Sequence, residues 1–235
     1  MLPPALRGLR DRAVAFALAQ TDSGKRLPEV SPDYWEVSER HVTLGTAAPL
    51  AAGLESASRT YASEGDPSRA ERAARAARGL RALIRTEFGP DYERHGHSGG
   101  LDAAVAMLMP PFVAADDGAA ERAWTRYPVL ALRTAGGLAP GVDWKSDGVS
   151  WTPETAMVAY TAAASGHALV AEHWMTWLSQ HCTSWGSLPE KVLPDGSPAG
   201  PAPLAWTAAL VVLTERELAT QRAGVIGSVA ASVSG

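Results

Sequence analysis

The chain has 235 residues, of which 46% are hydrophobic and 20% charged, and its formal net charge is −4. This composition allows a sizeable core in one domain and excludes wholesale disorder. The charge balance offers no basic surface for nucleic acid, and the single cysteine, Cys182, excludes a disulfide framework and a multi-thiolate metal site.

Alanine-rich segments with helical periodicity recur along the chain, and alternating strand patterns are almost absent. Asp66-Pro67 and Thr152-Pro153 each place a capping side chain before a proline, which is typical of a helix start, and Gly65 and Gly166 stand where a helix must end. The pattern predicts helices at residues 4–19, 43–63, 67–88, 101–107, 119–135, 153–165, 168–181 and 202–220.

Short turns alternate with long loops rich in glycine, proline and tryptophan, at residues 21–42, 89–100, 136–152 and 183–201. Loops of this length usually belong to functional surfaces. The helix after a long loop is rich in Ala, Leu and Val, whereas the helix after a short turn has a solvated face, as the arginines of residues 67–88 indicate. We therefore expect an all-α fold, an (α/α) toroid or barrel of helical hairpins with its chemistry on one rim.

No apolar run approaches the roughly 18 residues of a membrane span. Residues 1–20 are interrupted by Arg7, Arg10, Asp11 and Arg12, so they lack the apolar stretch of a secretory signal. We expect a soluble, cytoplasmic protein without a membrane partner.

Two loop segments carry a glutamate close to aromatic side chains. The first is Asp33-Tyr34-Trp35-Glu36, and the second is Gly186-Ser187-Leu188-Pro189-Glu190-Lys191-Val192, followed by Pro203-Leu204-Ala205-Trp206. An indole ring excludes water from a neighbouring carboxyl and favours a protonated acid, whereas a second carboxylate across a cavity can stay ionised and activate water. Either segment alone is more often a solvated surface charge.

Together these segments resemble glycoside hydrolase family 15, the glucoamylase-like enzymes, over about residues 28–218. The segment around Glu190 is similar to the family's Gly-x-Leu-Pro-Glu-Gln, with Lys191 in place of the glutamine, and residues 203–206 are similar to its Pro-Leu-x-Trp. Trp35-Glu36 resembles the family's general-acid loop. Leu101-Asp102-Ala103-Ala104 resembles the Leu-Asp-Ala-Ser that starts one inner helix, and Trp151-Thr152-Pro153-Glu154 falls where the next one begins.

The resemblance implies an inverting glycoside hydrolase that acts on glucosidic bonds of oligosaccharides or glucosides. Glu36 would be the general acid and Glu190 the general base, with a carbohydrate or glycoside as partner and neither cofactor nor metal. Glu154 could equally favour the positive end of its helix, and Trp174 and Trp177 are expected in the core. The residues expected to bind substrate are Asp33, Tyr34, Trp35, Trp151, Glu154 and Trp206.

The chain departs from the family pattern in its number of helices, about eight where the family has twelve. We expect one (α/α) barrel-like glycosidase domain over residues 1–235, shortened at its N-terminus and lacking hairpins that help to bind the sugar in the family. A truncated reading of a longer gene, or a homo-oligomer or partner chain that closes the open toroid, would explain this. The alternative function is a non-hydrolytic relative that binds a small ligand or a partner chain.

Two further clusters contain residue types that can bind metal ions. Asp116-Asp117 precedes a predicted helix without a second acidic motif, so we interpret it as a helix cap. His95-Gly96-His97 lies in a loop without a nearby carboxylate–histidine helix motif, so we interpret these histidines as solvated.

Overall fold

The computed structural model describes residues 2–115 and 117–233, and the side chains among them up to residue 223. The chain divides into two compact units, Met1–Tyr127 and Pro128–Gly235, each with a core of its own. Asp116, half of the predicted acidic cap, lies outside the described residues.

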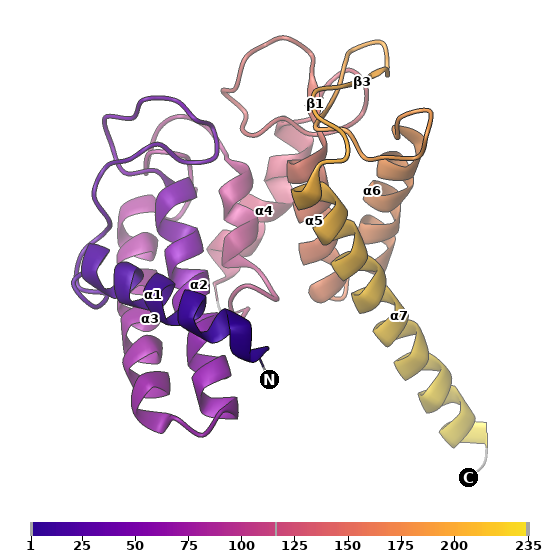
Figure 1. The fold of residues 1–235 in the computed structure, drawn as a ribbon. Coiled ribbons are helices and arrows are strands. Elements are labelled where there is room, and N and C mark those ends of the chain that lie inside the picture. Colours follow the sequence, from indigo (N-terminus) through magenta and orange to yellow (C-terminus); the bar gives the residue numbers. More distant parts are fainter. Residues whose placement is uncertain (1, 116, 234–235) are drawn as a thin grey trace. The chain divides into compact units, whose positions relative to one another are not determined.

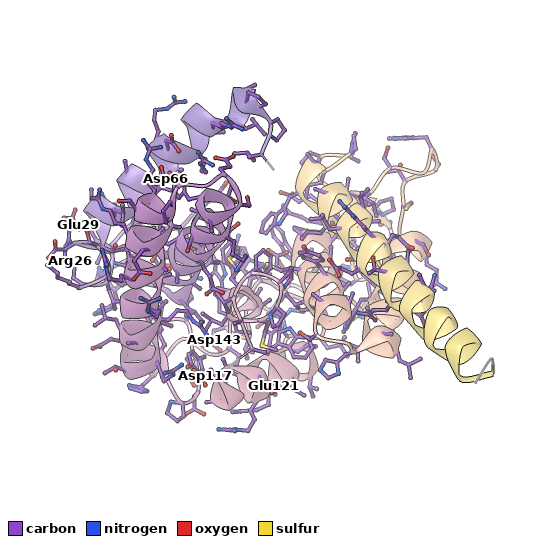
Figure 2. The ribbon with its side chains drawn as sticks, turned by 90° about the horizontal axis from the view of Figure 1, so that it is seen from below. Arg26, Glu29, Asp66, Asp117, Glu121 and Asp143 are labelled. Carbon is purple, nitrogen blue, oxygen red and sulfur yellow. The ribbon has the colours of Figure 1, made fainter. Side chains whose placement is uncertain are left out.

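The first unit is built on a helical hairpin, α2 (Leu44–Ser63) and α3 (Pro67–Phe88). Gly65 ends α2 with a φ of +79°, and the N–H of Asp66 donates to Tyr61 O at 3.0 Å, which is a Schellman ending. The Asp66 carboxylate then accepts the N–H of Arg69 at 3.0 Å and caps α3 (Figure 2). Both sequence predictions for this turn are confirmed.

Small side chains bring the helices of the first unit close together. The buried face of α2 is mostly alanine, and α3 buries an alanine- and leucine-rich stripe while most of its arginines face solvent. α1 (Pro4–Gln20) packs across the hairpin through Ala17 and Leu18, which meet Leu54 of α2 and Ala76 and Ala77 of α3 (Figure 1). A 3-10 helix, η1 (Ala103–Leu108), covers another side of α2, and α4 is Gly118–Leu130.

The second unit is built around α5 (Thr152–Ala164), of which every residue but Ala164 is buried. A helix that is buried on all sides needs partners all round, and α6 (Ala168–Gln180) and α7 (Ala205–Val233) both pack against it. Trp174 and Trp177 of α6 lie in the core, as predicted. Gly166, with a φ of +82°, ends α5 in a second Schellman turn, in which the His167 N–H donates to Ala162 O at 2.8 Å.

A small antiparallel sheet lies at the end of the second unit where α5 and α7 begin (Figure 1). Its strands are β1 (Ser150–Trp151), β2 (Lys191–Val192) and β3 (Pro198–Ala199), paired in the order β1-β2-β3 with Trp151 opposite Lys191. The sequence did not predict it, because a strand of two residues is too short to show an alternating pattern.

The all-α fold and its hairpins are confirmed, with three local corrections. The helix predicted at 101–107 is the 3-10 helix η1, and the helix predicted at 119–135 ends at Leu130, because the chain folds back so that the Arg133 N–H donates to Gly137 O. Thr152 does not cap α5, because its hydroxyl donates to Pro189 O instead. Among the described residues, no helix is both long and apolar enough to cross a membrane.

Candidate active-site loops

Glu36 stands at the apex of a tight turn that leads into α2. Its N–H donates to Asp33 O at 2.9 Å, and the Trp35 N–H donates to the Asp33 carboxylate at 2.9 Å. Glu36 is exposed and has a φ of +56°, a left-handed conformation that costs a non-glycine residue about 1–2 kcal/mol. Such strain persists only where the surroundings fix the backbone, so the carboxyl of Glu36 is presented to solvent on a fixed turn.

The side chain of Asp33 is fully buried beneath this turn. Its carboxylate accepts hydrogen bonds from Arg94 at 2.7 Å and from the Thr43 hydroxyl at 2.8 Å. Thr43 also caps α2, because its Oγ1 accepts the N–H of Thr46 at 3.1 Å. Asp33 thus joins the turn to the start of α2, and its predicted contact with a sugar stays a prediction.

Tyr34 and Trp35 are partly buried against the same group of charged side chains. The Tyr34 hydroxyl donates to Asp102 and accepts the N–H of Ala104 at 3.2 Å. The Arg94 guanidinium lies 3.7 Å from the centre of the Trp35 ring, within the range of a strong cation–π contact. Both aromatic side chains therefore hold the turn in place.

Arg94 is the residue of this site that sequence analysis missed. Its guanidinium is 2% exposed and contacts three carboxylates at 2.7 Å, those of Asp33, Glu39 and Asp102. It lies in the loop of residues 89–100, and its neighbour His95, expected to be solvated, instead contacts Glu39 at 2.8 Å. An arginine in a polar loop gives no sequence signal of burial.

The carboxyls around Arg94 respond differently to burial. Complete burial raises the pKa of Asp102, against the opposing effects of Arg94 and Tyr34. Burial also pushes the pKa of Glu39 upward, but hydrogen bonds from Arg94 and His95 outweigh it and hold that pKa below its usual range. Among the residues that the structure describes, no three His, Cys, Asp or Glu side chains are arranged so that they could hold a metal ion.

The backbone of Glu190 is tied to the starts of two helices in the second unit. Its N–H donates to Pro201 O at 3.0 Å, and its carbonyl accepts the N–H of Thr152 at 3.1 Å. The Thr152 hydroxyl also lies 2.8 Å from the hydroxyl of Thr207 in α7. The use of Thr152 as a link between α5, α7 and the Glu190 loop explains why it does not cap its own helix.

The carboxylate of Glu190 lies against a cation and an indole. Its Oε2 is 3.0 Å from Lys191 Nζ, which in turn lies 4.4 Å from the centre of the Trp151 ring. The Glu190 side chain is 24% exposed, so it is open to solvent on one side. At Gly200, a φ of +74° favours glycine, and a Cβ there would lie 2.7 Å from Glu190 Oε2, so a larger residue would displace this carboxylate.

The remaining predicted residues lie at helix starts in the second unit. Glu154 is 2% exposed in the first turn of α5, where the helix dipole favours its charge. Trp206 is 37% exposed in the first turn of α7. Trp185, on the loop that carries Glu190, is 74% exposed and was not among the predicted residues. The structure thus places Glu36 with Asp33, Tyr34 and Trp35 in the first unit, and Glu190 with Trp151 in the second.

The fold is that of known glycosidases. A wild-type glycosidase superposes with a TM-score of 0.72 at 22% identity, over 89% of this chain and 59% of that one. A glycosidase variant solved in complex with glucose gives the same values, and a second variant reaches a TM-score of 0.73.

This likeness defines an all-α glycosidase fold, and at this identity it defines the fold alone. The chain spans about 59% of the length of the solved glycosidases that it matches. No protein-family model and no curated protein sequence matches the chain.

Proposed function

We propose that the chain is a glucoamylase-like glycoside hydrolase of family 15, which cleaves glucosidic bonds of oligosaccharides or glucosides with inversion. The observation that carries the proposal is that, within a glycosidase fold, Glu36 and Glu190 each stand, open to solvent, on a loop fixed to the start of an apolar helix. The compartment expected for this activity is the cytoplasm.

Glu36 is proposed as the general acid that protonates the leaving oxygen, and Glu190 as the general base that activates water. The ion pair with Lys191, whose Nζ lies 3.0 Å from Glu190 Oε2, orients the carboxylate proposed as the base. Inversion requires the two carboxyl groups to stand about 6.5–9.5 Å apart, with the water between them and the sugar. The proposal therefore requires both carboxyl groups to reach the same glycosidic bond during the reaction.

The matched structures give this pair independent support. In two of them a single glutamate is replaced by alanine. The two replaced positions lie only three residues farther apart in sequence than Glu36 and Glu190 do.

The sugar ring is proposed to lie against the aromatic side chains of the loops. The apolar face of a pyranose stacks well on indole and phenol rings. Tyr34 and Trp35 directly precede Glu36 in sequence, Trp151 lies opposite Lys191 in the small sheet, and Trp206 lies in the first turn of α7. Asp33 and Glu154 are further residues proposed to bind the substrate. One matched glycosidase binds glucose, which agrees with a glucoside as the substrate class.

The greater length of the matched glycosidases favours a non-hydrolytic function as the alternative. Because the chain covers 59% of them, a non-hydrolytic relative that binds a small ligand or a partner chain is the second candidate. A homo-oligomer or partner chain that supplies the remaining part of the fold would again favour the glycoside hydrolase.

The test separates acid from base by the leaving group. Glu36→Gln should abolish release of glucose from an alkyl α-glucoside but retain turnover of α-glucosyl fluoride, because fluoride departs without a proton. Glu190→Gln should lose both activities. ¹H NMR of the first product anomer should show inversion.

Matched controls are available in both units. Glu29→Gln removes an exposed carboxylate at the outer edge of the first unit, beside Arg26 (Figure 2), and Glu215→Gln removes one on α7. Both controls should hydrolyse at the parental rate. If Glu36→Gln and Glu190→Gln do so too, the assignment is wrong. Calorimetric binding of malto-oligosaccharides without turnover by the parent would favour the non-hydrolytic alternative.

A further inference from the structure

We infer that Arg94 is the positioning residue of the Glu36 turn, a single guanidinium that fixes the chain on both sides of the proposed general acid. The inference rests on the proposed role of Glu36. It names a residue that does not contact the reacting bond and acts only through the turn.

The two flanks of Glu36 are bound to one nitrogen atom. Arg94 Nη2 donates to Asp33 Oδ1 and to Glu39 Oε1, both at 2.7 Å. Asp33 lies three residues before Glu36, and Glu39 lies three residues after it. The guanidinium therefore closes the segment 33–39 into a short loop, and closing a short loop sharply reduces the conformations open to its apex.

The two residues directly before Glu36 are also linked to this guanidinium, Trp35 directly and Tyr34 through Asp102. The Trp35 ring lies 3.7 Å from Arg94 Cζ, and the Tyr34 hydroxyl reaches Asp102, which accepts from Arg94 Nη1 at 2.7 Å. Of residues 33–39, only 36–38 are exposed. The side chains of Asp33, Tyr34, Trp35 and Glu39 thus converge on the Arg94 group, whereas Glu36 itself is exposed.

Arg94 is held in place by the helix that it serves. Its N–H donates to Gly100 O at 2.9 Å, and its carbonyl accepts the N–H of Leu44, the first residue of α2, at 2.9 Å. The backbone of Arg94 is therefore fixed relative to α2. Its guanidinium, bound to Asp33 and Glu39, fixes the turn relative to the same helix.

The arrangement of three buried carboxylates and the Trp35 ring around one cation requires arginine at position 94. Three carboxylates, none more than 7% exposed, share one cation. A buried ion network of this kind contributes little net stability compared with apolar packing, and its best-attested use is to specify one arrangement. A planar fork can serve two carboxylates on one side, a third on the other and an indole on its face at once, whereas the point charge of lysine cannot.

The test compares two substrates and one spectroscopic signal. In Arg94→Lys, kcat for an alkyl glucoside should fall about 10- to 100-fold, because a proton donor displaced by about 1 Å loses that much. The kcat for glucosyl fluoride should change much less, since fluoride departs without a proton from the acid. In protein labelled with 5-fluorotryptophan, the ¹⁹F signal of Trp35, assigned with Trp35→Phe, should shift and broaden.

Controls keep the inference separate from folding and from the proposed function. His97→Ala changes an exposed side chain of the same loop and should leave kcat and the Trp35 signal unchanged. If Arg94→Lys does not fold, Glu39→Gln, which weakens one flank without removing the cation, should give the same pattern at smaller amplitude.

Two results would overturn the inference about Arg94, and a third would overturn the proposed function. An unchanged Trp35 signal, or an equal loss of kcat on both substrates, would overturn the inference. If the parent protein hydrolyses neither substrate, the proposed function fails, while the Trp35 signal still decides whether Arg94 positions the turn.

Discussion

Replacing Gly45 by alanine should disturb the Glu36 turn from beneath. Gly45 is the second residue of α2, and a Cβ there would lie 2.3 Å from Asp33 Oδ2 and 3.0 Å from Tyr34 Cε1. Atoms cannot approach this closely, so either the carboxylate or the start of the helix must move. Asp33 cannot move freely, because Arg94 and Thr43 both donate to it.

The expected loss of stability in Gly45→Ala can be worked out by comparison with a second glycine of the same helix. At Gly53, which is exposed, a Cβ meets no atom within 4 Å. Gly53→Ala should therefore gain about 0.5–1 kcal/mol, the usual advantage of alanine over glycine in a helix. Gly45→Ala has a similar intrinsic gain but must overcome an overpacking cost of about 1–3 kcal/mol. The free energies of unfolding of the two variants should differ by about that cost.

Urea unfolding followed by circular dichroism measures this difference, and the ¹⁹F signal of Trp35 reports the turn. We expect Gly45→Ala to be the less stable variant and to shift the Trp35 signal, with Gly53→Ala leaving it in place. Equal stability of the two variants, with an unmoved Trp35 signal, would refute the close packing of Asp33 on the start of α2.

Three further predictions follow from the loops and from the start of α4. Because Glu36 has a φ of +56°, Glu36→Gly should unfold with a free energy about 1 kcal/mol higher than Glu36→Ala, and urea titrations that show no difference would contradict the strained turn. Lys191→Met should change the free energy of unfolding by less than about 1 kcal/mol, since its ion pair with Glu190 is partly exposed, yet steady-state assays should show a lower kcat on glucosides; parental kcat would count against an orienting role. Asp117 caps α4, and although burial raises its pKa, hydrogen bonds from Tyr92 and Arg85 outweigh burial and hold that pKa below its usual range. Its contribution is therefore complete above the ordinary carboxylate pKa of about 4 and is lost as the pH falls, so Asp117→Ala should cost about 1–2 kcal/mol at pH 7 and less near pH 3, and urea unfolding that gives an equal cost at both pH values would contradict the assignment.

Local rules explain why so much of the fold was predictable. The caps and turns at Asp66, Gly65 and Gly166 depend on hydrogen bonds between residues at most five positions apart, and the burial of Trp174 and Trp177 follows from helical spacing. The sequence also directed attention to the turn at Glu36 and to the loop at Glu190, because their residue types and order resemble a known pattern.

The tertiary structure alone decided how those loops are held. Arg94, Asp33, Glu39 and Asp102 come from three separate segments, and nothing in the residues next to Arg94 predicts that it is buried. Thr152 has the sequence of a cap, but Pro189 O, 37 residues away, competes for its hydroxyl. Helix formation is governed by neighbours within one or two turns, whereas a buried charge needs partners that only the folded chain can bring to it.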